Sequence, residues 1–217
     1  MSKPALPVRP DYTSFEQHVG QLRSQLSGAD PYRLADHAGA GFMRLGESRG
    51  EFHLNVWNQP VVLTFPDYQA SQAGSQERLP TFNTALLLYY FNTADGSPLG
   101  DKWISFTELP DGRFYTQAFQ GYSGNELAKT FQNDLEAFKL AAEKLGGRPQ
   151  PLGDLSFEFQ ALPRVPVLAA CWRGDDEFPS SYKILFDSSA SHYLPTDAYA
   201  ILGSHITHRL ISASSKS

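Results

Sequence analysis

The chain has 217 residues, of which 41% are hydrophobic, 19% charged and 13% aromatic, and this composition is typical of a folded globular domain. Eighteen basic and 23 acidic residues give a formal net charge of −5, and no stretch concentrates lysine and arginine. We therefore expect neither a nucleic-acid interface nor attraction to an anionic membrane surface, because both need clustered positive charge. The longest apolar runs, 85–91 and 165–172, are far shorter than the roughly 20 residues of a membrane helix.

The N-terminal stretch MSKPALPVRP lacks the apolar centre of a secretory signal, so we expect a cytoplasmic protein. Its prolines predict an extended arm over residues 1–12, followed by a single domain over 13–211 and a disordered tail over 212–217. Cys171 is the only cysteine, which excludes an intrachain disulfide and a cysteine-ligated metal cluster within the chain. Because Cys171 ends the apolar run 167–171, we interpret it as a small buried hydrophobe, with a reactive thiolate as the alternative.

In the first half of the chain, hydrophobic periodicity changes from helical to strand-like. It predicts an N-terminal helix between Ser14 and Gly28 and a short second helix over 31–37. Strict alternation of apolar and polar residues then predicts a β-hairpin, with strands around 52–56 and 61–63 that are joined at Asn58-Gln59. We expect a loop over 66–79, and then a nearly all-apolar helix that begins at Thr81 or Asn83 and reaches Phe91.

In the second half, a strand is predicted over 103–107 and one long amphipathic helix from Ser123 to Leu145. Three consecutive strands with short connections follow, over 155–162, 165–173 and 181–187, and a last helix over 196–211. Helices and hairpins stand in separate blocks without alternating strands and helices. The sequence therefore predicts the α+β class, with an antiparallel sheet and hairpins packed against several amphipathic helices in a single domain.

The stretch CWRGDDEFPSSYKILFD, residues 171–187, carries three successive acids between two apolar strands. Asp175, Asp176 and Glu177, together with Asp187, are candidate ligands of a divalent cation, because hard cations prefer carboxylate oxygens. Crowded carboxylates can also raise one pKa for acid–base chemistry. The alternative is a hairpin tip that is acidic because it faces water.

A second group of candidates combines aromatic and basic side chains. Trp103, Arg113 and Tyr115 lie near one another in the sequence, and Trp172 and Arg173 precede the acidic run. Tyr, Trp and Arg beside apolar neighbours are typical of a concave site for an organic ligand, and also of an ordinary core margin. We predict ligand binding at these five residues, without an identified cofactor.

Other motifs give weaker signals. The glycines of residues 39–46 lack the spacing of a dinucleotide-binding loop. His205 and His208 are three residues apart on the last predicted helix and could give two metal ligands. The helical phase leaves His205 at the edge of the apolar face and His208 nearly on the solvent side, so two solvated histidines are the alternative. His192 follows serines within 188–191, but adjacent residues rarely meet in a catalytic triad.

Arg164 lies in the turn Leu162-Pro163-Arg164-Val165-Pro166. Because both prolines fix φ and lack an amide donor, we expect this arginine to project rigidly from the turn. We predict that it pairs with a nearby acid such as Glu158 or Asp154.

Several patterns occur together in a recognisable order: GDKWISF at 100–106 with Glu108-Leu109, LPRVP at 162–166, Trp172 with DDEFP at 175–179, and ILFD at 184–187. With the last helix, they resemble the family catalogued as domain of unknown function 3786, found in bacteria and archaea. The resemblance covers most of the chain from about residue 30 and implies no established activity. It also implies that some relatives carry an added cysteine-rich domain of iron–sulfur type, which a chain with one cysteine lacks.

Two main functional hypotheses follow. The first is a non-catalytic binding or accessory protein that holds an organic cofactor or a protein partner on an aromatic surface around Trp103, Tyr115 and Trp172. The second is a metal-assisted hydrolase or lyase, in which the acids of 175–177 with Asp187 hold a cation that activates water. An interaction module of a larger complex is a third possibility. We prefer the first, because the sequence contains no complete catalytic set.

Overall fold

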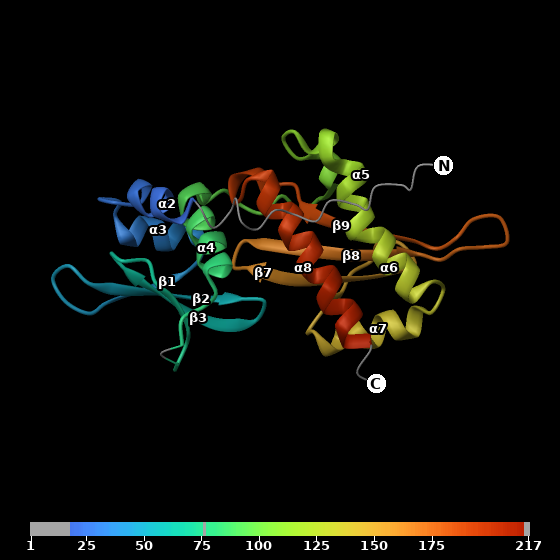
Figure 1. Cartoon of the computed structure of the whole chain (residues 1–217), viewed down its shortest axis with the longest axis horizontal. Coiled ribbons are helices and arrows are strands. Elements are labelled where there is room, and N and C mark those ends of the chain that lie inside the picture. Colours follow the sequence, from blue (N-terminus) through green and yellow to red (C-terminus); the bar gives the residue numbers. More distant parts are fainter. Residues whose placement is uncertain (1–17, 76, 215–217) are drawn as a thin grey trace, which may run out of the picture.

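Two antiparallel sheets divide the chain into an N-terminal and a C-terminal half, as the computed structural model of residues 18–75 and 77–214 shows (Figure 1). The N-terminal sheet has the strand order β1-β2-β3-β4, with β1 Gly41–Arg44, β2 Gly50–Val56, β3 Gln59–Phe65 and β4 Ala70–Gln72. The C-terminal sheet has the order β5-β9-β8-β7-β6, with β5 Trp103–Ser105, β6 Arg148–Pro149, β7 Leu155–Leu162, β8 Val165–Trp172 and β9 Ser181–Asp187. This architecture confirms the α+β class.

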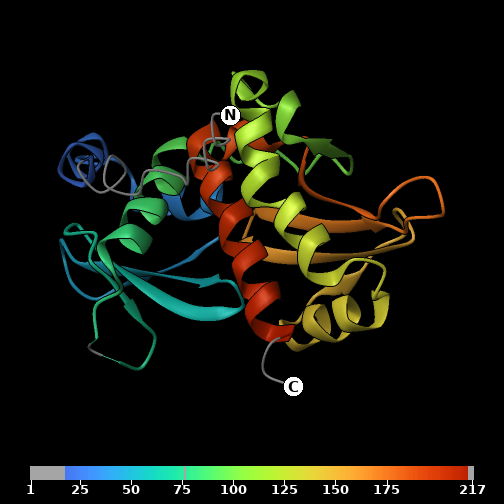
Figure 2. The same cartoon turned by 45° about the vertical axis from the view of Figure 1, so that its right-hand side comes forward.

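Three helices belong to the N-terminal half, namely α2 Val19–Gln25, α3 Pro31–Ala38 and α4 Thr81–Thr93. The C-terminal half has η1 Phe106–Glu108, α5 Gly112–Tyr122, α6 Gly124–Phe131, α7 Leu135–Lys144, η2 Ala190–His192 and α8 Thr196–Ser214. Figure 2 shows α6 and α8 lying across one face of the C-terminal sheet. None of the helices in the described residues combines the length and apolarity that a membrane crossing needs. The predicted arm at 1–12 lies outside the described residues, and α8 continues three residues into the predicted tail.

Strand alternation explains why the C-terminal sheet binds its helices. On β9, Tyr182, Ile184 and Phe186 are buried, whereas Ser181 and Lys183 are exposed. Because successive side chains point to opposite faces, the buried set lies on one side. Tyr182 contacts the ring of Phe138 on α7 at 5.2 Å, and Phe186 contacts Tyr199 on α8 at 4.8 Å. Cys171 is fully buried and free, as expected for a small hydrophobe, and burial raises the pKa of its thiol.

The long helix predicted from Ser123 to Leu145 is wrong, because the chain breaks it into α6 and α7. Gln132 adopts a positive φ of 47°, and its carbonyl accepts a hydrogen bond from the Tyr182 hydroxyl at 3.0 Å. The Asp134 carboxylate then accepts a hydrogen bond from the amide of Ala137 at 2.9 Å and starts α7 as its N-cap. Helix α5, just before Ser123, was not predicted, and neither was β4 in the expected loop.

The two halves meet at the tip of the β2–β3 hairpin. Trp57 and Asn58 both have positive φ, 50° and 62°, as the central residues of a type I′ turn do, so the turn lies one residue earlier than predicted. The Trp57 amide donates to the carbonyl of Ala161 at 3.0 Å, and its indole packs against His205 at 5.3 Å and under the Arg209 guanidinium at 5.3 Å. His205 is therefore partly buried, as a position at the edge of the apolar face predicts, whereas His208 is exposed.

Candidate functional site

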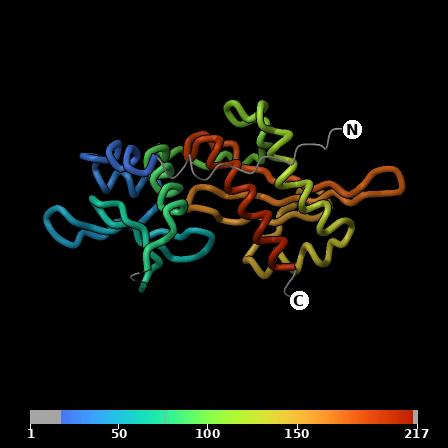
Figure 3. The backbone as a smooth tube through the Cα atoms, viewed as in Figure 1, coloured from blue at the N-terminus to red at the C-terminus, as the bar shows by residue number. Residues whose placement is uncertain are grey.

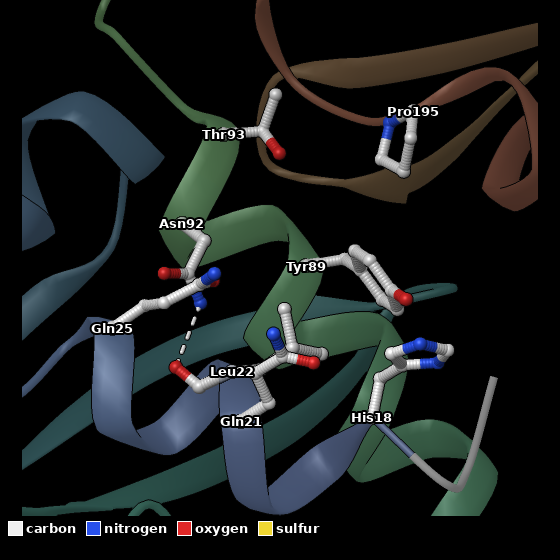
Figure 4. A pocket seen from close by; sticks show the side chains of 8 residues that line it. All are labelled: His18, Gln21, Leu22, Gln25, Tyr89, Asn92, Thr93 and Pro195. Atoms are coloured by element: carbon white, nitrogen blue, oxygen red, sulfur yellow. Dashed lines mark hydrogen bonds between the residues drawn. The ribbon is translucent and has the colours of Figure 1, made fainter.

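A cavity of about 640 Å³ lies where α2, α4 and the start of α8 come together (Figure 4). Its lining comes from three segments far apart in the sequence, and consists of His18, Gln21, Leu22, Gln25, Tyr89, Asn92, Thr93 and Pro195. The first seven residues belong to the N-terminal half and Pro195 to the C-terminal half. The cavity is therefore a feature of the junction between the two halves.

Helix α4 positions one wall of the cavity because its opposite side is locked into the core. Tyr90 is fully buried and Phe91 nearly so, whereas the neighbouring Tyr89, Asn92 and Thr93 are partly exposed on the other side of the helix. The Asn92 amide donates to the carbonyl of Leu22 on α2 at 3.1 Å, as Figure 4 shows. It also donates to the carbonyl of Leu88 at 2.8 Å. The same side chain thus ties α2 to α4 and lines the cavity between them.

The cavity lining is polar, and among the residues that the structure describes it contains no aspartate, glutamate, lysine or arginine. Amide groups come from Gln21, Gln25 and Asn92, a hydroxyl from Thr93 and an aromatic ring from Tyr89. Burial raises the pKa of Tyr89, and the negative charge of Asp197 raises it further. Asp197 therefore adds negative potential at Tyr89, which disfavours an anionic occupant beside that ring.

A cluster of Asp95, Ser97 and His192 lies beyond Thr93 in the chain and just before Pro195. The Nδ1 atom of His192 is 2.7 Å from a carboxylate oxygen of Asp95 and 3.1 Å from the hydroxyl of Ser97. The hydrogen bond with His192 holds the pKa of Asp95 well below its usual range, and bonds from Ser97 lower it further. A catalytic triad uses the two ring nitrogens for different partners, and here both partners meet Nδ1. The cluster is therefore a hydrogen-bonded link between two segments rather than a triad, and its serine is Ser97, not one of those within 188–191.

Beneath this cluster, phenol groups join the two halves. The Tyr90 hydroxyl donates to the carbonyl of Ala38 at 2.7 Å and accepts from the Arg164 amide at 3.0 Å. The Tyr193 hydroxyl donates to the carbonyl of Ser97, and its ring lies 6.1 Å from that of Tyr90. Burial raises the pKa of both phenols, so they remain protonated donors at neutral pH.

The predicted pairing of Arg164 with Glu158 or Asp154 is wrong. Glu158 forms an ion pair with Arg148, and Asp154 accepts a hydrogen bond from the Arg173 amide at 2.7 Å. The Arg164 side chain instead lies over Gly39, and its buried Nε has no hydrogen-bond partner among the described residues. The two prolines direct this side chain across the junction and away from its own sheet.

The four acidic candidates do not come together. Asp175 uses one carboxylate oxygen to accept the amides of Glu177 and Phe178 at 2.9 and 2.8 Å, and these bonds lower its pKa. Asp176 and Glu177 are exposed at the tip of the β8–β9 hairpin, which projects from the sheet in Figure 3. Asp187 is buried at the other end of β9. Within residues 18–75 and 77–214, no group of three or more His, Cys, Asp or Glu could hold a metal ion.

Asp187 has a structural environment of its own. One of its carboxylate oxygens accepts from the amide of Gly100 at 2.8 Å, and from the amide and hydroxyl of Ser189 at 2.8 and 2.6 Å. These three bonds fasten the loop before β5 to the end of β9. The buried carboxylate thus closes the edge of the sheet.

The five aromatic and basic candidates occupy three different places. Trp103 and Trp172 are half-buried and pack against Leu168, Ala170 and Leu185 in a small apolar cluster on the sheet face opposite the helices. Arg113 and Tyr115 are exposed on the first turn of α5, and Arg173 is exposed after β8. None of the five lines the cavity at the junction.

Sequence reasoning missed the residues of the cavity. One signal was available, because Tyr89, Asn92 and Thr93 interrupt an otherwise apolar helix with a polar side. That pattern indicates a helix face that lies against water or a polar partner. The opposite wall, from α2 and Pro195, carries no comparable signal.

Comparison with known proteins gives one family. No match was found among curated proteins or among solved structures. A family model matches residues 30–209, which include both sheets and α4 but begin after α2. Four of the eight cavity residues, all on or next to α2, therefore lie before the matched region. Because the match spans most of the chain, the protein belongs to the family described as Domain of unknown function (DUF3786).

Proposed function

We propose that the protein is a non-catalytic binding protein whose junction cavity holds a small, uncharged, polar organic ligand. The lining of the cavity carries this proposal, because it combines the Tyr89 ring and the His18 imidazole with amide and hydroxyl groups, and none of its described residues carries a carboxylate, ammonium or guanidinium group. Its volume of about 640 Å³ falls within the roughly 300–1,000 Å³ of ligand pockets. Its position between the two halves is also where ligand sites commonly occur.

The lining chemistry narrows the ligand class. The ring of Tyr89 offers a flat apolar face, and the amides of Gln21 and Gln25 both donate and accept hydrogen bonds. A ring-shaped ligand with several hydroxyl or amide groups meets both features. Sugars and nucleosides without phosphate are therefore suitable probes, whereas phosphorylated or carboxylated ligands would find no lysine or arginine among the described lining residues.

A pair of tryptophan substitutions tests the proposal on the full chain. Gln21 is exposed on α2 at the cavity, so Gln21→Trp should fill the cavity without changing the core. Gln117→Trp places the same side chain on the exposed side of α5, away from the cavity lining. In ligand-observed NMR with a mixture of disaccharides and nucleosides, we expect at least one probe to bind the unmodified protein and Gln117→Trp, and Gln21→Trp to lose that binding.

Two outcomes would contradict the proposal. One is that none of these probes binds the unmodified protein. The other is that a probe binds Gln21→Trp as tightly as it binds Gln117→Trp, because the bound site would then lie elsewhere.

The other hypotheses receive different support. The metal-assisted hydrolase or lyase is not supported by the placement of its acids, since Asp175 is held by its own turn and Asp187 lies at the far end of β9. A protein partner on the aromatic surface around Trp103 and Trp172 stays a prediction, with both rings on the sheet face opposite the helices.

A further inference from the structure

A second cavity, of about 250 Å³, lies in the N-terminal half between the start of α3, β1 and the turn from β1 to β2. Three aromatic rings line it. The ring of Phe42 has Tyr32 at 5.1 Å and 78° and Phe65 at 5.9 Å and 88°. Tyr32 is 58% exposed, so its ring is accessible from solvent. The rings therefore form apolar walls that meet at nearly right angles beside an open space.

Charges of both signs surround these rings. Asp30 and Glu47 contribute carboxylates to the lining, and Arg44 and Arg49 contribute guanidinium groups. One Asp30 oxygen accepts the amide of Tyr32 at 3.1 Å, which holds that carboxylate at the start of α3. Two carboxylates and two guanidinium groups give a lining without net charge but with separated positive and negative groups.

The two arginines have different roles. The Arg44 guanidinium donates to the carbonyls of Gly46 and Glu47 at 2.7 and 3.1 Å, so it is part of the turn. The Arg49 side chain forms no hydrogen bond or ion pair with any residue of 18–75 or 77–214. Arg49 is therefore the guanidinium group available to an anion, for which its planar donors are well suited.

These contacts distinguish between ligand classes. A purely cationic ligand could pack on the aromatic faces but would meet two guanidinium groups. A purely anionic ligand would meet two carboxylates and would leave the rings unused. We propose that this cavity binds a small zwitterion, with a methylated ammonium group against Tyr32, Phe42 and Phe65 and an anionic group at Arg49. The site is separate from the junction cavity and does not depend on the function proposed for it.

Glycine betaine is the probe that tests this proposal, and two analogues each remove one charge from it. Choline replaces the carboxylate with a hydroxymethyl group, and 3,3-dimethylbutanoate replaces the ammonium nitrogen with carbon at nearly unchanged shape. In calorimetric titrations of the full chain we expect betaine to bind about tenfold more tightly than either analogue, since each lacks one charged contact.

Single variants locate the binding. Tyr32→Ala should weaken betaine binding by about tenfold, because it removes one aromatic wall. Arg49→Gln should reduce the affinity for betaine to that for choline, because the anion then has no guanidinium partner. Phe114→Ala is the matched control, since Phe114 is an 83% exposed aromatic residue in the first turn of another helix, and it should bind betaine as the unmodified protein does.

Three results would overturn the proposal. The first is no betaine binding at roughly 50 mM. The second is equal affinity for betaine and for either analogue. The third is unchanged betaine binding in Tyr32→Ala. The variant Gln21→Trp, which fills the junction cavity, should leave betaine binding unchanged, and this result separates the two sites.

Discussion

His205 on α8 lies at the contact between the two halves, and its protonation should make the stability of the protein depend on pH. It packs against the indole of Trp57 from the β2–β3 turn, and Arg209 lies over the same indole. Burial lowers the pKa of His205 to about 4, and the charges of Arg209 and His208 contribute in the same direction. The folded protein therefore favours the neutral imidazole, whereas the unfolded chain protonates it near pH 6.5.

Protonation of His205 should consequently make stability fall as the pH is lowered. Between pH 7 and pH 5 the unfolded chain takes up the proton and the folded protein does not, so this residue should remove about 2 kcal/mol from the free energy of unfolding. We expect the variant His205→Gln to lose about 2 kcal/mol less than the unmodified protein over this range, as measured by urea unfolding at both pH values. His208→Gln, which changes an exposed histidine one turn away, should keep the original pH dependence. Equal losses in all three proteins would show that His205 is not the group responsible.

At the scale of elements, the break between α6 and α7 allows two short helices, in place of one long helix, to pack against the same core. The positive φ of Gln132 turns the chain, and the Asp134 carboxylate caps α7 through the Ala137 amide. An N-cap acid satisfies an amide that the helix itself cannot satisfy. The start of α7 therefore depends on one exposed side chain.

Removal of that cap gives a direct measure of its contribution. Asp134→Ala should lower the free energy of unfolding by about 1 kcal/mol, because the Ala137 amide loses its acceptor. Glu136→Ala in the same turn removes only the exposed contact with Lys139 at 3.9 Å and should cost less than about 0.5 kcal/mol. Urea unfolding of both variants compares the two values. Similar losses would mean that charge near the helix start, and not the cap, is what stabilises α7.

The elements also show what the sequence could and could not predict. The strands at 155–162, 165–172 and 181–187 were predicted closely, because their apolar residues are bounded by short turns. The helix break was not predicted, because Leu127 and Phe131 before it and Phe138 after it are all buried against the same core. The hydrophobic period therefore continues through the break and does not reveal it.

At the scale of the whole molecule, each half is continuous in sequence and the chain passes between them once, through residues 94–102. The halves are joined by the Trp57 turn on α8 and by the contact of Tyr90 with Arg164, and the pair of Asp95 and His192 fastens the connecting segment to the C-terminal half. The junction cavity lies beside these contacts. Its shape consequently depends on how the two halves are held together.

Neither cavity could be predicted from the sequence, for the same physical reason. The walls of the junction cavity come from residues 18–25, 89–93 and 195, and those of the second cavity from 30–32, 42–49 and 65. Only tertiary packing brings such segments together. Hydrophobic periodicity shows which helix or strand a residue belongs to, but not which distant segments pack beside it. The acidic run 175–177 was conspicuous in the sequence because it is contiguous. In the structure these consecutive acids form a turn, in which the Asp175 carboxylate accepts the backbone amides of Glu177 and Phe178.

The position of β5 at the edge of the C-terminal sheet has a consequence for the order of folding. Strands β7, β8 and β9 follow one another along the chain, but β5 pairs with β9 through Trp103–Asp187 and Ser105–Leu185, which are 84 and 80 positions apart in the sequence. Closing so long a loop costs more entropy than forming the consecutive hairpins, so we expect β5 to join an existing three-stranded sheet late. Pulsed hydrogen exchange during refolding should then protect the amides of β7–β9 before those of β5, and simultaneous protection would count against this order. Until β5 pairs with β9, the edge of β9 and the Asp187 carboxylate remain open to water. The refolding protein therefore exposes an unpaired strand edge that is covered in the native protein.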